Sequence, residues 1–239
     1  MPKIITNTII TDTTGWTIRA ATVTIPVIFL TIILLQPWIE PKWMFLDPLT
    51  SAEFAPECCP PYFGFVSTLG VMLWTMSAAI SLFAALMIFI SRQGTSKDMS
   101  LVKFALTAGI LSGWLALDDA FLLHERVFPA LGVPQNAVMA IYVLLTLTYV
   151  FASWRTIFRF DFWILMFGGF AFAASLFIDI YFSSLLPYLV YLEDSAKFIG
   201  IFCWTSFHIT TLGRALSQNL STAKNSDFGD ASIPKESTI

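Results

Sequence analysis

Charged residues are scarce in this sequence. Together, 13 Lys and Arg and 16 Asp and Glu make up 12% of its 239 residues, whereas a soluble domain carries roughly 25%. The formal net charge is −3 and no basic stripe is present, which excludes a nucleic-acid-binding protein. No period of roughly 20–50 residues repeats along the chain, so no repeat architecture is expected.

Hydrophobic residues, by contrast, make up 56% of the chain and include 23 Phe and 8 Trp. One compact core of this size could not bury so much apolar surface, which excludes a soluble domain and a disordered chain. A transmembrane helix needs about 20 mostly apolar residues, and six stretches meet this requirement. They are Thr17–Trp38, Phe63–Ser91, Met99–Leu123, Asn136–Trp154, Phe160–Ser184 and Tyr188–Gly213. We therefore expect an all-α, polytopic bundle of six transmembrane helices that contacts the lipid bilayer.

The distribution of Lys and Arg predicts the orientation of this bundle, because cytoplasmic loops carry an excess of positive charge. Ten Lys and Arg lie in the N-terminal region, the second and fourth loops and the C-terminal region, whereas the opposite side holds only Lys42 and Arg126. Both termini are therefore expected in the cytoplasm, with loops Ile39–Tyr62 and His124–Gln135 and the turn near Pro187 outside. The first apolar run is longer than the core of a cleavable signal peptide, so we expect it to remain as an uncleaved first span. We therefore expect a multi-pass protein of the plasma (inner) membrane.

The chain is predicted to form one membrane domain, residues 1–216, followed by a polar, disordered cytoplasmic tail, residues 217–239. In the first outer loop Cys58 and Cys59 are adjacent, on the oxidising side of a bacterial membrane. Two interpretations stay open: they are ordinary loop thiols, or they form an intermolecular bridge in a homo-oligomer. Cys203 lies within a predicted span, where packing is its expected role.

Ionisable side chains inside the spans are the most informative feature of the sequence. A charge in the bilayer core costs several kcal/mol unless it faces protein or water and has a partner. Such residues gather near one end of the third, fifth and sixth spans, and we call them the polar cluster. They are Asp118, Asp119, His124, Glu125, Asp179, Glu193, Asp194 and Lys197. With both termini inside, all of them fall at one depth near the outer surface, which predicts an outward-facing polar site.

Regular helical geometry predicts how the polar cluster is arranged. Asp118 and Glu125 are seven residues apart and share one face of a helix, whereas Asp119 and His124 point elsewhere. In the sixth span Glu193 and Lys197 are an i,i+4 pair in the favourable order, and Asp194 is three residues from the same lysine. Asp179 is the lone acid of its span, so we expect a network of Asp179, Lys197 and Glu193, with Asp118 nearby.

Several carboxylates this close cannot all ionise without a cation, so shared protons or a bound metal are expected. Carboxylates with one histidine could bind a divalent ion that activates water against a lipid ester or amide. The candidate metal ligands are Asp118, Asp119, His124, Glu125 and Glu193. The candidate catalytic acids and bases are Asp118, Glu125 and Glu193, oriented by a network of Asp179, Asp194 and Lys197. This pattern favours a metal-dependent membrane hydrolase that acts on a lipid-like substrate.

Other functions fit the same residues. Intramembrane Asp, Glu and Lys groups are also typical of a proton- or cation-coupled transporter or channel, in which the acids bind the ion and Lys197 competes for them. A third alternative is a structural membrane subunit, whose polar cluster joins helices by hydrogen bonds.

Two further sets of residues are expected to have structural roles. His208 is expected to hydrogen bond to a neighbouring Thr or carbonyl, and Gly168, Gly169 and Gly200 are expected to be close-packing positions.

Three segments resemble an uncharacterised group of bacterial multi-pass membrane proteins. They are Tyr62–Trp74, Leu117–Glu125 with its DDxFxxHE motif, and Leu192–Gly200 with its EDxxK motif. The resemblance spans most of the chain and implies a bacterial origin, but no activity.

Two weaker resemblances concern single features. The proposed metal chemistry is similar in kind to that of the alkaline ceramidase and adiponectin receptor superfamily, which are seven-helix proteins that use three histidines, an aspartate and a serine. The chain has 2 histidines, so no residue is carried over. Residues Glu193–Gly200 resemble the last helix of microbial rhodopsins, where a lysine carries retinal, and this resemblance implies a chromophore-binding protein as a further alternative.

Overall fold

The computed structural model describes residues 2–54, 60–91, 96–182 and 189–230, and all regular structure within them is helical. Six long helices make up most of it: α1 (Pro2–Leu35), α4 (Phe65–Ser91), α5 (Ser96–Phe121), α7 (Gln135–Ile157), α8 (Phe162–Phe182) and α9 (Leu189–Asp230). Short helices α2 (Lys42–Phe45), α3 (Pro48–Phe54) and α6 (Phe128–Ala130), with the π-helical turn η1 (Leu123–Val127), connect them. Cys58, Cys59 and the turn near Pro187 lie outside the described residues.

Five helices in the described part of the chain are long and apolar enough to cross a membrane. They are Gly15–Leu35 of α1, Phe65–Ser91, Met99–Phe121, Gln135–Ile157 and Phe162–Tyr181. The protein is therefore a helical membrane protein, and these five segments agree with the first five predicted spans to within a few residues. The sixth predicted span falls on α9, which is not among the five because it is less apolar.

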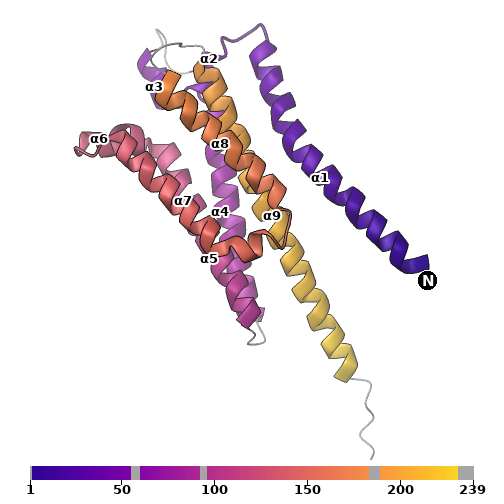
Figure 1. Ribbon diagram of the computed structural model, residues 1–239. Coiled ribbons are helices and arrows are strands. Elements are labelled where there is room, and N and C mark those ends of the chain that lie inside the picture. Colours follow the sequence, from indigo (N-terminus) through magenta and orange to yellow (C-terminus); the bar gives the residue numbers. More distant parts are fainter. Residues whose placement is uncertain (1, 55–59, 92–95, 183–188, 231–239) are drawn as a thin grey trace, which may run out of the picture.

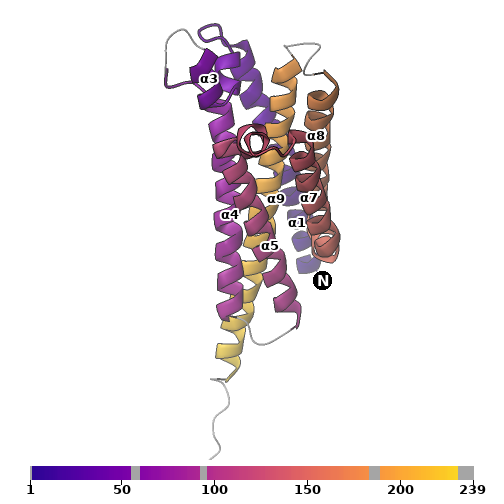
Figure 2. The ribbon, with the colours of Figure 1, turned by 90° about the vertical axis from the view of Figure 1, so that its left-hand side faces the viewer.

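Helix α9 is the central helix of the bundle, and its position explains its composition. It packs against α8, α4 and α1 and lies between α4 and α8 in Figure 2. Most side chains along its middle, from Ile201 to Leu212, are buried, among them the polar Thr205 and His208. Because neighbouring helices cover it, α9 needs fewer apolar residues than a helix that faces lipid.

Small residues allow the helices to approach closely. Helices α4 and α5 pack along their length through buried Ser and Ala side chains such as Ser77 and Ala108. A Cβ on Gly168 of α8 would lie 2.8 Å from Cys203 Cβ of α9, and one on Gly200 would lie 2.9 Å from the Phe172 ring. The close-packing role is thus confirmed for Gly168 and Gly200. It is wrong for Gly169, which has no atom within 4 Å of such a Cβ.

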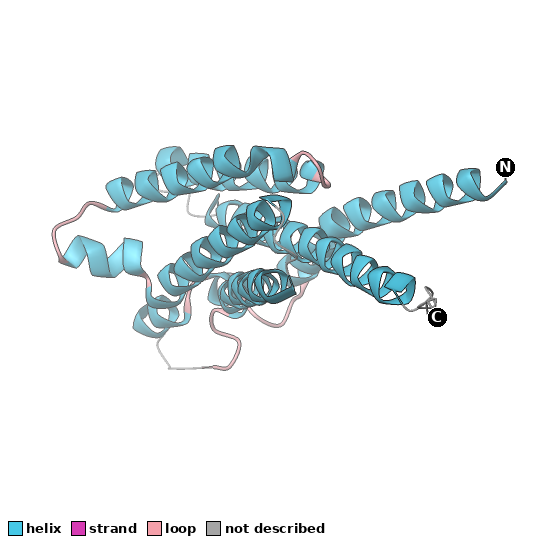
Figure 3. Ribbon diagram, turned by 90° about the horizontal axis from the view of Figure 1, so that it is seen from below, coloured by secondary structure: helices cyan, strands magenta, loops and turns pink. Residues whose placement is uncertain are grey.

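The helices alternate in direction between two ends of the bundle (Figure 1). One end carries α2, α3 and η1, and we call it the α3 end. The N-terminal part of α1 and the C-terminal part of α9 both point to the opposite end, where they diverge (Figures 1 and 3). Helix α9 continues to Asp230, beyond the boundary after residue 216 at which we expected a disordered tail to begin.

Ion pairs join the connecting segments at each end. At the α3 end, Arg126 binds both carboxylate oxygens of Glu53, at 2.5 and 2.9 Å, and donates to the Thr50 hydroxyl. At the opposite end, Arg19 Nε lies 2.8 Å from both carboxylate oxygens of Asp161. The first pair holds η1 against α3, and the second holds α1 against the start of α8.

Candidate functional site

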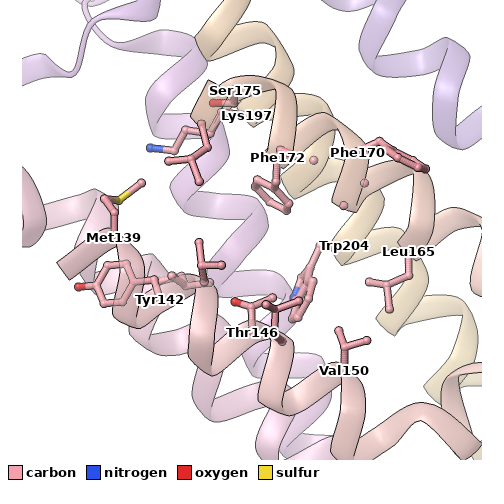
Figure 4. A pocket seen from close by; sticks show the side chains of 18 of the residues that line it. Met139, Tyr142, Thr146, Val150, Leu165, Phe170, Phe172, Ser175, Lys197 and Trp204 are labelled. Atoms are coloured by element: carbon pink, nitrogen blue, oxygen red, sulfur yellow. The ribbon is translucent and has the colours of Figure 1, made fainter. Parts of the chain in front are cut away.

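A cavity of about 760 Å³ opens between α7 and α8. These consecutive helices do not pack against one another: α7 packs on α5 and η1, and α8 packs on α9 and α1. Lining side chains therefore come from α7 and α8 on two sides and from α5 and α9 at the back (Figure 4). The volume is within the range of roughly 300–1,000 Å³ that is typical of ligand sites.

The cavity has a polar end and an apolar end. All eight residues of the polar cluster line it, at the α3 end of the bundle. Farther along, the lining is apolar and aromatic, with Val150, Leu165 and Trp204 (Figure 4). Several lining side chains are also exposed at the surface of the bundle, such as Leu147 and Phe170, so the cavity is open sideways between α7 and α8. The cavity thus combines a polar end with a longer apolar part.

Asp118 and His124 form the most buried part of the polar cluster, with exposed fractions of 2% and 6%. The Asp118 carboxylate accepts hydrogen bonds from the His124 backbone N–H at 3.0 Å, from His124 Nδ1 and from the Tyr142 hydroxyl at 2.7 Å. A carboxylate at Nδ1 fixes the tautomer and orientation of the imidazole. Nε2 is then the reactive nitrogen, and it lies 3.5 Å from Glu125 Oε1.

The electrostatics of this pair favour a protonatable imidazole. Burial by itself lowers the pKa of His124, but the hydrogen bond and negative charge of Asp118 outweigh it and raise the pKa above its ordinary value of 6.5. A carboxylate-paired histidine that lines a cavity is suited to general acid–base chemistry.

The contact between Asp118 and His124 corrects an expectation from helical geometry. We expected His124 to point away from Asp118, as it would on a continuous helix. Instead α5 ends at Phe121, Leu122 adopts a left-handed conformation with φ of 51°, and η1 follows. The chain thereby turns back, and the Asp118 carboxylate accepts the backbone N–H of His124. A left-handed leucine costs roughly 1–2 kcal/mol, and at a buried position it marks a conformation that the surrounding contacts stabilise.

Lys197 has a different partner from the one that we expected. Its Nζ donates to Asp119 Oδ1 at 2.8 Å, and the other oxygen of Asp119 accepts from Trp74 Nε1 at 3.1 Å. No ion pair from Lys197 to Asp179 or Glu193 is found in the described part of the chain. Lys197 of α9 thus pairs with an acid of α5.

The predicted metal ligands lie around one cavity but do not form a metal centre. All five are described, yet no three His, Cys, Asp or Glu side chains among the described residues form a group that could hold a metal ion. Asp118 and His124 contact each other, Asp119 binds Lys197, and Glu193 forms no ion pair with another described residue.

Two residues of the site were missed at the level of sequence. Tyr142 and Trp74 donate hydrogen bonds to Asp118 and Asp119, respectively. Both lie in apolar spans without other ionisable residues nearby in sequence, so only contact between helices reveals them. His208 has the structural role that we expected: its Nδ1 bonds to the Trp204 carbonyl and its Nε2 to the Tyr149 hydroxyl, each at 2.8 Å.

These features define the class of protein: a helical membrane protein with a laterally open cavity whose polar end is lined by acids, one histidine and one lysine. Residues 19–211 match the model of a family described as a domain of unknown function (DUF8692), and the chain belongs to this family. No curated protein and no solved structure matches it. The family is consistent with an uncharacterised group of proteins, whereas no comparison shows a likeness to alkaline ceramidases.

Proposed function

We propose that this protein binds a lipid-like molecule in the cavity between α7 and α8 and hydrolyses an ester or amide bond in it. The observation that carries the proposal is the Asp118–His124 pair, buried at the polar end of a cavity whose remaining walls are apolar. An apolar cavity with a few convergent polar groups is the usual form of a ligand site.

In this reaction His124 is the general base and acid. Its Nε2 takes a proton from water while the water oxygen attacks the carbonyl carbon of the substrate. The C–O or C–N bond then breaks, and the imidazolium returns the proton to the leaving alcohol or amine. Asp118 orients the imidazole and stabilises its charged form. Lys197 provides the positive charge that a developing oxyanion requires.

The proposal includes a topology in which α9 is the sixth span and both termini are cytoplasmic. A long helix enclosed by α1, α4 and α8 supports the sixth span, and the distribution of Lys and Arg supports the orientation. The polar end of the cavity is then in the outer leaflet of the plasma membrane. Lipids could enter sideways between α7 and α8.

Conversion of lipids by the purified protein tests this proposal. Wild-type protein in nanodiscs made from a bacterial polar lipid extract would be followed by mass spectrometry. We expect one lipid class to disappear as two products that together contain one added water appear. His124→Gln should slow this conversion by about 10²–10⁴-fold, the usual contribution of a general base. Thr148→Val, a lipid-facing change on α7 outside the cavity, is the matched control and should convert lipids normally. No conversion by the wild type, or full activity of His124→Gln, would overturn the proposal.

A second candidate is a proton- or cation-coupled carrier. The observation in its favour is the Lys197–Asp119 ion pair inside the cavity, because a lysine that competes for a carboxylate can be displaced by an incoming cation. Ion flux through liposomes that contain the wild-type protein, abolished by Asp119→Asn, would support this function. It would also separate the carrier from the hydrolase, since His124→Gln should not abolish flux.

A further inference from the structure

We infer that the molecule held in this cavity is an amphiphile whose head carries a positively charged amine. This inference rests on the proposed function and specifies its class of substrate. It follows from which acids of the polar cluster already have partners and which do not, together with the shape of the cavity.

Two of the six acids in the polar cluster already accept hydrogen bonds from other side chains of the protein. Asp118 accepts hydrogen bonds from His124 and Tyr142, and Asp119 accepts them from Lys197 and Trp74. The only lysine of the cavity lining is thus already bound to a carboxylate, and the only histidine is bound to another.

Four acids remain at the same end of the cavity: Glu125, whose Oε1 lies 3.5 Å from His124 Nε2, and Asp179, Glu193 and Asp194. Within the described part of the chain, no Lys or Arg forms an ion pair with any of them. Negative charges gathered at one end of a cavity repel one another, and a bound cation would relieve this repulsion. An ammonium group has three N–H donors and no acceptor, so it complements this excess of acceptors, whereas a carboxylate or phosphate head would be repelled.

The apolar end of the cavity is an independent observation that distinguishes an amphiphile from a free cation. The lining residues of α8 include the stretch from Leu165 to Ser175 (Figure 4), which is roughly 15 Å along the helix axis. Trp74, Phe172 and Trp204 form an aromatic wall along it, with ring centroids 5.8–5.9 Å apart. A small ion would fill none of this space, whereas a hydrocarbon chain would cover it.

The test compares the head groups of ligands that have the same chain. Hexadecylamine, hexadecanol and hexadecanoate, each with a brominated chain, would be titrated into nanodiscs that contain the full-length protein. Binding would be read as quenching of tryptophan fluorescence, because Trp74 and Trp204 line the cavity. We expect the amine to bind about tenfold more tightly than the carboxylate, as one charge-assisted hydrogen bond would provide.

Two variants and one soluble competitor complete the test. Asp179→Asn with Glu193→Gln should weaken amine binding about tenfold and leave hexadecanol binding unchanged, which also shows that the variant folds. Glu40→Gln, an acid outside the cavity, is the matched control and should change nothing. Butylamine should compete weakly because it lacks the chain.

Other results of these titrations would lead to different conclusions about the ligand. Equal binding of all three ligands, or a preference for the carboxylate, would overturn the amine inference and leave the hydrolase proposal standing. Full displacement of hexadecylamine by butylamine at equal concentration would identify a free-cation site and likewise overturn the inference. If none of the three ligands binds, both the inference and the lipid-binding part of the proposed function fail.

Discussion

Asp118 holds both the backbone N–H and the imidazole of His124, a residue only six positions later in the chain. One carboxylate thereby ends helix α5 and orients the histidine that follows it. The same contact couples the local fold to the chemistry of the site, because a change at Asp118 alters the helix end and the imidazole together.

Replacing Asp118 by Asn should lower the pKa of His124. Burial lowers this pKa, and the charge and hydrogen bond of Asp118 outweigh it, with Glu125 adding to the increase and Lys197 opposing it. With the carboxylate removed, burial dominates and the pKa should fall below 6.5. The rate at which diethyl pyrocarbonate modifies His124, followed by peptide mass spectrometry against pH, measures this shift. An unchanged or higher midpoint would contradict the pairing.

The same pair makes stability depend on pH. Because the pKa of His124 is raised by folding, the stabilisation is fully present below about pH 6.5 and is lost as the pH rises through the higher value of the folded protein. Thermal unfolding in detergent should show this loss in the wild type. Asp118→Asn should remove that part of the pH dependence, and Glu40→Gln should retain it.

Lys197 and Asp119 should be energetically coupled. Lys197→Met leaves a mostly buried carboxylate without its cation, and we expect a loss of about 1–3 kcal/mol in the free energy of unfolding. The double variant, Lys197→Met with Asp119→Asn, should lose less free energy of unfolding than the two single variants lose in sum. Lys197→Met with Asp179→Asn is the matched cycle and should be additive, because these two residues form no ion pair. Coupling in the second cycle and not the first would contradict the observed pairing.

Two neighbouring glycines should differ in their tolerance of alanine. Gly168→Ala places a Cβ 2.8 Å from Cys203 Cβ and should destabilise the protein by about 1–3 kcal/mol through overpacking. Gly169→Ala meets no atom within 4 Å and should be neutral or slightly stabilising, since alanine favours the helix. Unfolding in detergent compares the two, and equal effects would contradict the packing of α8 on α9.

Lowering the pH should break the contact between Glu53 of α3 and Arg126 of η1. The hydrogen bond and charge of Arg126 lower the pKa of Glu53, so their contact persists below the ordinary pKa of a glutamate and is lost as the pH falls through the lowered value. Hydrogen exchange of α3, corrected for the intrinsic rate at each pH, should increase in that range. Glu53→Gln should show the fast exchange already at neutral pH. A variant that exchanges as slowly as the wild type would contradict the contact.

Composition was enough to predict a helical membrane protein. Apolar runs located five spans to within a few residues, because the cost of exposing polar groups to lipid acts on each segment separately. The same reasoning grouped Asp118, Asp119, Asp179 and Glu193, since acids in separate spans at one depth share the same constraint. Their presence around one cavity agrees with that grouping.

Partners within the polar cluster depended on the tertiary structure. The left-handed Leu122 ends α5 and brings His124 to Asp118, which a continuous helical repeat cannot predict. The rotation of α5 against α9 selects Asp119 for Lys197. The separation of α7 from α8 creates the cavity, because helices joined by a short connection need not pack together. Sequence determined which segments are apolar and where the charges lie; packing between helices decided which charges meet and what space they enclose.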